Sequence, residues 1–158
     1  MNKILEIIFL IYFITHIPIT ICLDLQALLG VYYPSTLQSF NKWYAKEYND
    51  QLMGDPPIWF KSFIFAELVF QLPFFFVAVY GLYFKKGWIR IPSIVYGIHV
   101  ATTVLPILAT IVFSSYNTTS EKLLLTSFYA PYFIIPLVLA IYMILYEDPF
   151  ATKDKKKV

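Results

Sequence analysis

Four stretches of this sequence are apolar over more than twenty residues each, and each is long enough to cross a lipid bilayer as a helix. They run over about residues 4–29, 60–84, 89–113 and 123–146. A hydrocarbon core of about 30 Å requires about 20 helical residues, and a helix satisfies its own backbone polar groups in lipid. We therefore expect an all-α, polytopic membrane protein whose single four-helix domain, residues 1–150, precedes a basic tail, residues 151–158.

The composition supports a membrane protein and argues against several other classes. Hydrophobic residues make up 59% of the chain and charged residues 14%, against about 25% charged in an average soluble domain. A net charge of +2 is too small to suggest a nucleic-acid partner. Neither a Gly-rich phosphate loop nor a zinc-type spacing of Cys and His is present. The sequence therefore predicts no nucleic-acid partner, no cofactor and no metal site.

Each of the four apolar stretches contains proline. A proline within a helix removes one hydrogen bond and kinks the helix, and a bilayer tolerates this where neighbours or a cavity accommodate the freed carbonyl. The kinks indicate either helices that bulge apart around a cavity or irregular packing alone. The prolines are Pro18, Pro73, Pro106, Pro131 and Pro136.

The distribution of Lys and Arg predicts the orientation in the membrane. With both termini in the cytosol, eight of the twelve basic residues lie on the cytosolic side, as the positive-inside rule favours. Residues 30–59 then lie on the opposite side, where their aromatic and charged residues predict a short amphipathic helix across the mouth of the bundle. The glycosylation sequon at Asn117 lies on that side as well.

Two acids within the apolar stretches, Asp24 and Glu67, are the strongest functional signal. Asp24 lies about five residues before the outer end of the first span, and Glu67 lies about six residues after Lys61 at the outer start of the second. Because consecutive spans run antiparallel, both carboxylates are expected roughly 8 to 10 Å below the same interface. We therefore expect them to meet.

Two carboxylates in contact in a low-dielectric site do not readily both ionise, so we expect this pair to share a proton and to carry about one negative charge. The core of each span lacks Lys and Arg. The compensating cation would then be the amine of an amphipathic ligand or, in an enzyme, a carbocation formed during the reaction. The alternative is that nearby amides and hydroxyls satisfy the acids, which then only hold helices together.

Two further polar residues are expected to line the ligand site on the same helix faces as these acids. Gln71 follows Glu67 by one helical turn and is placed to donate a hydrogen bond to it. His16 precedes Asp24 by eight residues, on the same face but about 12 Å deeper. It is interpreted either as a buried core histidine or as a proton carrier.

The third span presents a polar stripe and a small-residue face. Tyr96, His99 and Thr103 follow one another at i, i+3 and i+7, so they share one side of a helix. Of these, Tyr96 and Thr103 are expected to line the ligand site. Gly97 and Ala101 form a small-xxx-small pair on another side. That pair predicts close helix packing, either within the chain or in a homodimer.

Long words of the sequence carry a family resemblance. They are "HIPITICLDLQA", "KWYAKEYND", "PPIWFKSFIFAELVFQLPFF", "WIRIPSIVYGIH" and "YAPYFIIPLVLAIYMI". With these words the chain resembles the sigma-2 receptor family of the EXPERA group, which also includes the emopamil-binding sterol isomerases. The resemblance covers all four spans and diverges in residues 30–41 and 114–122. It implies an endoplasmic-reticulum protein that binds sterols and cationic amphiphiles in an intramembrane cavity and takes part in cholesterol homeostasis.

The resemblance also implies roles for individual residues. Asp24 would pair with a ligand amine, and Glu67 would hydrogen-bond to Asp24. Asp50 matches a loop position that is functionally important in the family. We expect this loop to be exposed to water, which favours a structural contact for Asp50 over a ligand contact. The resemblance further implies that the cavity is lined by Trp43, Thr103, Tyr129 and Tyr132. For the two tyrosines, the alternative is a place in the interfacial aromatic belt.

In the tail, Lys155 and Lys156 are fourth and third from the C-terminus, like a dilysine retrieval signal of the endoplasmic reticulum. The alternative is a basic patch near anionic lipid.

The leading functional hypothesis is a non-enzymatic receptor, with a sterol or oxysterol, cationic amphiphilic molecules, a cholesterol transporter and a second copy of the chain as expected partners. The runner-up is a sterol double-bond isomerase, for which the resemblance implies a histidine and a further acid in the pocket. A third reading is a purely structural partner of a transporter.

Overall fold

The computed structural model describes residues 1–151, so the tail with Lys155 and Lys156 lies outside the described residues. The described chain is helical and contains no strand. Its α-helices are α1 (Lys3–Ile19), α2 (Gln26–Leu29), α3 (Ser35–Glu47), α4 (Gln51–Gly54), α5 (Ile58–Ala66), α6 (Leu72–Tyr83), α7 (Arg90–Val112) and α8 (Thr119–Leu145). Two π-helical segments, Thr20–Asp24 and Glu67–Gln71, continue α1 and α5.

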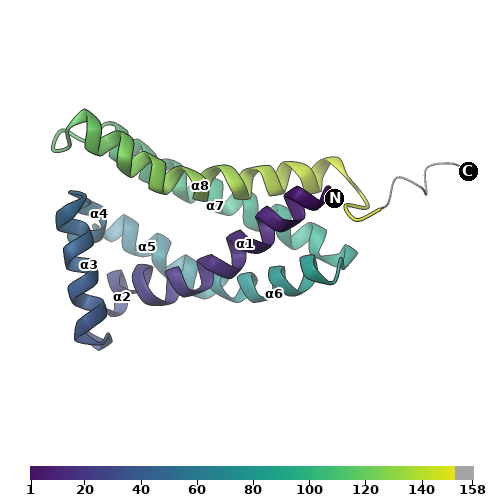
Figure 1. Cartoon of the computed structure of the whole chain (residues 1–158), viewed down its shortest axis with the longest axis horizontal. Coiled ribbons are helices and arrows are strands. Elements are labelled where there is room, and N and C mark those ends of the chain that lie inside the picture. The colour runs from purple at the N-terminus through teal and green to yellow at the C-terminus, as the bar shows by residue number, and fades with distance from the viewer. Residues whose placement is uncertain (152–158) are drawn as a thin grey trace, which may run out of the picture.

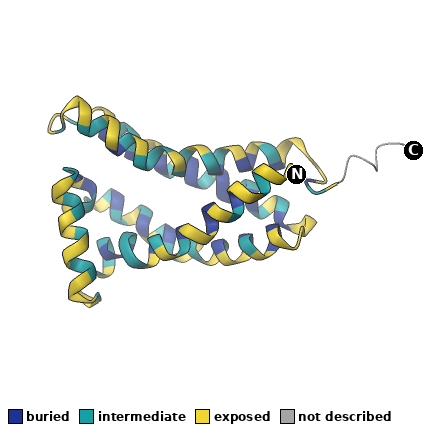
Figure 2. Cartoon of the chain, in the orientation of Figure 1, coloured by how far each residue is buried: buried dark blue, intermediate teal, exposed yellow. Residues whose placement is uncertain are grey.

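Within the described residues, four helical stretches are long and apolar enough to cross a membrane. They are Lys3–Tyr32, Ile58–Tyr83, Gly87–Val112 and Thr119–Leu145. Much of their surface is exposed and apolar, with side chains such as Ile4 at 66% and Leu145 at 71% exposure, and Figure 2 shows the buried residues on the inner sides of the helices. Such a surface is stable against hydrocarbon rather than water. The prediction of an all-α, multi-pass membrane protein is confirmed.

The four spans form a bundle whose helices lie close together near the chain termini and spread apart toward α3 (Figure 1). In Figure 1, α8 runs beside α7, α1 crosses the bundle diagonally, and α3 lies across the end opposite the chain termini. At the terminal end, the α-amino group of Met1 donates to the carbonyl of Pro149. Both described ends of the chain therefore lie at the same end of the bundle, facing away from α3.

The small-residue face of α7 is used inside the chain. A Cβ added to Gly97 would lie 2.7 Å from the Ala140 Cβ and would also collide with the backbone carbonyl of Pro136. Only glycine permits this close approach of α7 to α8. Of the two predicted uses of the Gly97–Ala101 pair, helix packing within the chain is the one observed at Gly97.

Both ends of α8 are capped by side chains. At its start, Thr118 and Glu121 form a capping box. At its end, the Arg90 guanidinium donates from Nε to the carbonyls of Met143 at 2.8 Å and Tyr146 at 3.1 Å. The last turn of a helix leaves its carbonyls without intrahelical partners, so Arg90 joins the start of α7 to the end of α8.

Residues 35–54, here called the lid, close one end of the bundle, as the prediction of a helix across its mouth required. Asp50 anchors the lid: its Oδ1 accepts from the Met53 amide at 3.2 Å, and its Oδ2 accepts from the Tyr129 hydroxyl at 2.8 Å. The Asn117 side chain donates to the Asn49 carbonyl at 2.9 Å. The expected wet location of Asp50 is wrong, because the lid folds over it and leaves it 2% exposed.

Replacing Gly97 with alanine should destabilise the bundle by about 1 to 3 kcal/mol, because the added methyl group overpacks the α7–α8 contact. Thermal unfolding of the purified protein in detergent measures this effect. Gly30→Ala is the matched control, since a Cβ there meets nothing within 4 Å. Equal melting temperatures for the two variants would contradict the assigned packing.

Asp50→Ala should loosen the lid, because it removes a helix cap, which is worth about 1 kcal/mol, and leaves the Tyr129 hydroxyl without an acceptor. Asp50→Asn can keep its oxygen toward the Met53 amide and turn its NH₂ group toward the Tyr129 hydroxyl, whose oxygen can accept, so it should retain the lid. Hydrogen exchange of residues 35–54 distinguishes the two variants. Equal protection in both would show that Asp50 is not the anchor.

Asp50 also predicts a dependence of stability on pH. Burial raises the pKa of the Asp50 carboxyl above its ordinary value. The folded state therefore binds this proton more tightly than the unfolded state, and stability falls as the pH rises through the interval between the two pKa values. In Asp50→Asn this part of the decline should be absent, which unfolding measured across that pH interval will show. An unchanged pH profile would contradict it.

Candidate functional site

A cavity of about 610 Å³ lies among the spans beneath the lid. All four spans and the lid contribute to its wall, which is mainly apolar and aromatic. Its size falls within the range of about 300 to 1,000 Å³ that is typical of small-molecule sites. Examples of its apolar lining are Ile19, Phe63, Ile64, Val104 and Ile107.

The two π-helical segments place the acids at this cavity. In Thr20–Asp24 the amide of Leu25 donates to the Thr20 carbonyl at 3.1 Å, and in Glu67–Gln71 the amide of Leu72 donates to the Glu67 carbonyl. These i to i+5 bonds widen the turn, and such turns often occur at functional sites. Both acids thus lie on locally widened helix, a feature that the prolines alone did not predict.

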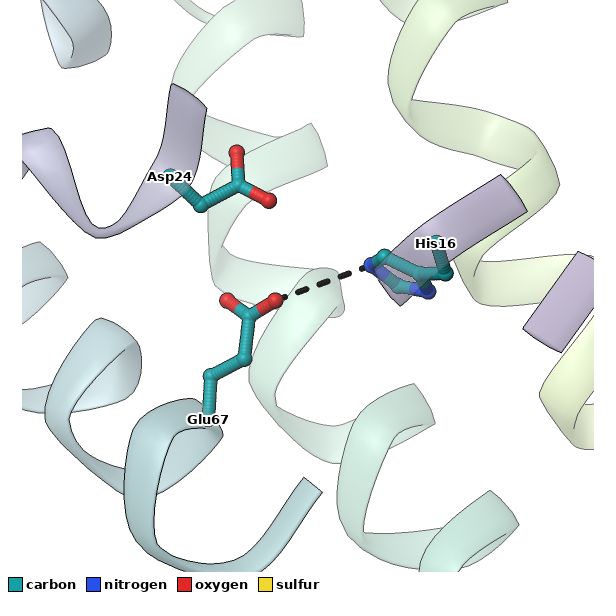
Figure 3. A group of neighbouring side chains, drawn as sticks. All are labelled: His16, Asp24 and Glu67. Atoms are coloured by element: carbon teal, nitrogen blue, oxygen red, sulfur yellow. Dashed lines mark ion pairs between the residues drawn. The ribbon is translucent and has the colours of Figure 1, made fainter. Parts of the chain in front are cut away.

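Asp24 and Glu67 meet at the cavity, as expected from their equal depth. Donor atoms of His16, Asp24 and Glu67 all lie within 4.8 Å of one another, and Figure 3 shows the three side chains converging. Glu67 is only 8% exposed. The fully buried Thr20 hydroxyl donates to Glu67 Oε1 at 2.5 Å and fixes the orientation of that carboxylate.

His16 lies beside the acids rather than 12 Å deeper, so that expectation is wrong. Its Nε2 is 3.6 Å from Glu67 Oε1, and its ring lies between Phe75 and Tyr132, with centroid distances of 4.6 and 4.7 Å. The ideal α-helical rise overestimated the separation, because the chain between His16 and Asp24 is partly π-helical and because side chains reach toward a common point. His16 lines the cavity.

Two polar residues that were predicted at the site line the cavity, but neither donates a hydrogen bond to an acid among the described contacts. Gln71 lines it, but in the part of the chain described here its amide donates no hydrogen bond to Glu67. In a π-helical segment four residues do not complete a turn, so the expected i, i+4 contact is lost. Thr103 also lines the cavity, while its hydroxyl donates to the Val100 carbonyl at 3.1 Å.

Among the predicted aromatic residues, Trp43, Tyr129 and Tyr132 line the cavity. Tyr96 does not, which corrects its assignment to the site. The Tyr96 hydroxyl forms a hydrogen bond with the Tyr12 hydroxyl at 3.0 Å, and the Tyr96 ring stacks on the ring of Phe74. Residues that share a helical stripe point in the same direction from the helix axis, but they lie at different depths. The cavity does not extend as far along the helix as Tyr96.

Sequence reasoning missed most of the lid's contribution. Of the lid residues at the cavity, only Trp43 was anticipated, and the structure adds Phe40, Asn41, Tyr44, Tyr48 and Met53. The amphipathic pattern of residues 35–47 could have indicated this contribution, because the apolar face of such a helix packs against another apolar surface.

The cavity wall includes two acids but neither Lys nor Arg among the described residues. In a low-dielectric surrounding a carboxylate without a cationic partner is costly. The arrangement can therefore attract a cation, supplied by a ligand or by an ion.

Known proteins that resemble this chain were compared with it. Sigma intracellular receptor 2 of Homo sapiens is 46% identical over 162 residues, covering 93% of this chain and 90% of that protein. The protein of the same name from Xenopus tropicalis is 45% identical over 166 residues, covering 98% and 96%. Efficient mitochondria targeting-associated protein 19 of Saccharomyces cerevisiae is 30% identical over 150 residues, covering 82% and 91%.

The family comparison agrees with these relatives. Residues 36–143 match the family model EBP, described as EXPERA (EXPanded EBP superfamily). The match includes the lid, the second acid and the last two spans, and the relatives extend the similarity through the first span. The chain belongs to the EXPERA superfamily.

Proposed function

We propose that this protein is a non-enzymatic intramembrane receptor for sterols and cationic amphiphilic molecules that takes part in cholesterol homeostasis. The observation that carries the proposal is a carboxylate pair, Asp24 and Glu67, at the wall of an apolar cavity whose described lining contains neither Lys nor Arg. The relatives named Sigma intracellular receptor 2 support a receptor rather than an enzyme.

A ligand amine supplies the charge that the cavity lacks. Asp24 would form the ion pair, while Glu67, held by the Thr20 hydroxyl, would share a hydrogen bond with Asp24. The low dielectric strengthens a contact between opposite charges. Aromatic rings of the wall, including Trp43 and Tyr132, add cation–π attraction of about 0.5 to 2 kcal/mol.

The rest of the cavity suits a rigid apolar skeleton. Its wall is built from aliphatic and aromatic side chains of the four spans and of the lid, so a sterol would bury its rings without leaving polar groups unpaired. The volume of about 610 Å³ exceeds what a small amine requires. Shape and apolar area would therefore bind neutral sterols, and the acids would add affinity for amines.

The endoplasmic reticulum is the membrane we propose, with both termini in the cytosol. Along the sequence, eight of the twelve basic residues fall in the two terminal segments and in residues 85–90, which under the positive-inside rule supports a cytosolic location for these segments. A homodimer and a cholesterol transporter are the protein partners we propose.

Asp24→Asn should weaken binding of a cationic amphiphile by at least about 100-fold, because removing one member of a buried charge pair costs about 3 to 5 kcal/mol. Calorimetric titration of the purified protein measures the affinity, and the melting temperature reports folding. Asp55→Asn, an exposed acid beside the lid, is the matched control.

A neutral sterol should bind Asp24→Asn and the unchanged protein alike, because it uses the apolar wall. Amine affinity retained within about twofold in Asp24→Asn would reject the ion-pair assignment.

A sterol double-bond isomerase is the second candidate. One observation favours it: His16 lies 3.6 Å from Glu67, so an acid, a base and aromatic rings converge at the cavity. Such a site can deliver a proton to an alkene and remove another. Against it, the described cavity wall holds only the two acids, whereas an isomerase would need a further one.

The isomerase is tested by incubating purified protein with a sterol alkene in deuterated water. We expect no shifted double bond and no deuterium incorporation above a protein-free sample. Conversion that disappears in Glu67→Gln, with folding retained, would replace the receptor assignment with an enzyme.

A further inference from the structure

We propose that His16, Asp24 and Glu67 also form a binding site for a divalent transition-metal ion, with Zn²⁺ as the best match. The ion would occupy the position at which a ligand amine pairs with Asp24, so metal and amine would compete. The inference concerns a ligand class beyond the proposed receptor function, and it rests on the geometry of these three side chains.

The distances suit one small ion. Zn²⁺ is bound at about 2.0 to 2.2 Å by histidine nitrogen and carboxylate oxygen, which places tetrahedral ligand atoms about 3.4 Å apart. The Nε2 of His16 and Oε1 of Glu67 are already 3.6 Å apart, and the three donor atoms lie within 4.8 Å of one another. A side-chain adjustment of Asp24 by about 1 Å would complete the three contacts.

The histidine is available as a ligand. His16 is 6% exposed, and its Nδ1 is buried without a hydrogen-bond partner among the described residues. Its ring points toward Glu67 in Figure 3, and the 3.6 Å between Nε2 and Glu67 Oε1 is too long for a hydrogen bond. The rings of Phe75 and Tyr132 hold the imidazole in this direction. An ion at this point would give His16 Nε2 and both carboxylates a partner, while the Nδ1 of His16 would still lack one among the described residues.

Charge favours a divalent ion over a monovalent one. Binding of the ion would release the proton that the two acids share; the two ionised carboxylates and the neutral imidazole then carry a charge of minus two, which Zn²⁺ neutralises. The Thr20 hydroxyl donates to Glu67 at 2.5 Å and would orient this ligand, as partners of metal ligands commonly do. Three protein ligands leave a fourth position, which here faces the cavity.

The test is calorimetric titration of Zn²⁺ into the purified full chain without a histidine tag, in lipid nanodiscs. We expect one saturable site. His16→Gln should weaken it by at least about tenfold, whereas His99→Gln, at the other histidine within a span, should leave it unchanged. Visible absorption of bound Co²⁺ should show a four-coordinate site in the unchanged protein and lose that signature in His16→Gln.

Competition gives a second measurement that does not depend on a variant. Zn²⁺ should raise the apparent dissociation constant of a cationic amphiphile but leave that of a neutral, non-chelating sterol nearly unchanged. If the unchanged protein binds the amine but shows no saturable Zn²⁺ binding, the metal proposal fails while the receptor assignment stands, so the two can be separated.

Absence of saturable Zn²⁺ binding to the unchanged protein would overturn the proposal. Binding that survives in His16→Gln, or that disappears equally in His99→Gln, would overturn it as well.

Discussion

The structure around the site depends on the proximity of the carboxyl groups of Asp24 and Glu67, whose nearest oxygens lie within 4.8 Å of each other. Taking an acid out of water costs several kcal/mol unless it finds partners, and two acids at one depth need more partners than either alone. The Thr20 hydroxyl supplies one at 2.5 Å, and the two π-helical turns bring both carboxyl groups to a cavity instead of into lipid. A tightly packed bundle at this depth would leave the pair without space for a cation.

The bundle divides into a packed half and an open half. Toward the terminal end, Phe13, Phe75 and Tyr96 pack against one another, and Gly97 allows α7 to touch α8. Toward the lid the spans separate and enclose the cavity. A cavity lowers stability, because the residues that line it lose dispersion contacts. The close packing of the other half of the bundle offsets this loss. Asp50 has a different task from the paired acids, since its two hydrogen bonds hold the lid over the hollow.

Hydropathy and spacing predicted the fold class, the lid helix and the meeting of the two acids, because each depends on position along an apolar helix of known rise. They failed where the position of a residue depends on side chains from other helices. His16 lies at the acids rather than below them, Tyr96 lies in packed aromatic surroundings, and Gln71 donates no hydrogen bond to Glu67 among the described contacts. Each error used ideal α-helical geometry across a segment that is π-helical or at a depth where the cavity has ended.

The sequence by itself determined that the chain spans a membrane as helices and that two acids must be sheltered there, because lipid enforces both through the cost of unsatisfied polar groups. Only the tertiary structure decided what surrounds those acids. A cavity of about 610 Å³, a histidine 3.6 Å from Glu67 and a lid anchored through Asp50 arise from contacts between residues far apart in the chain. Periodicity fixes the face a residue occupies, but which faces meet depends on how kinked helices pack in three dimensions.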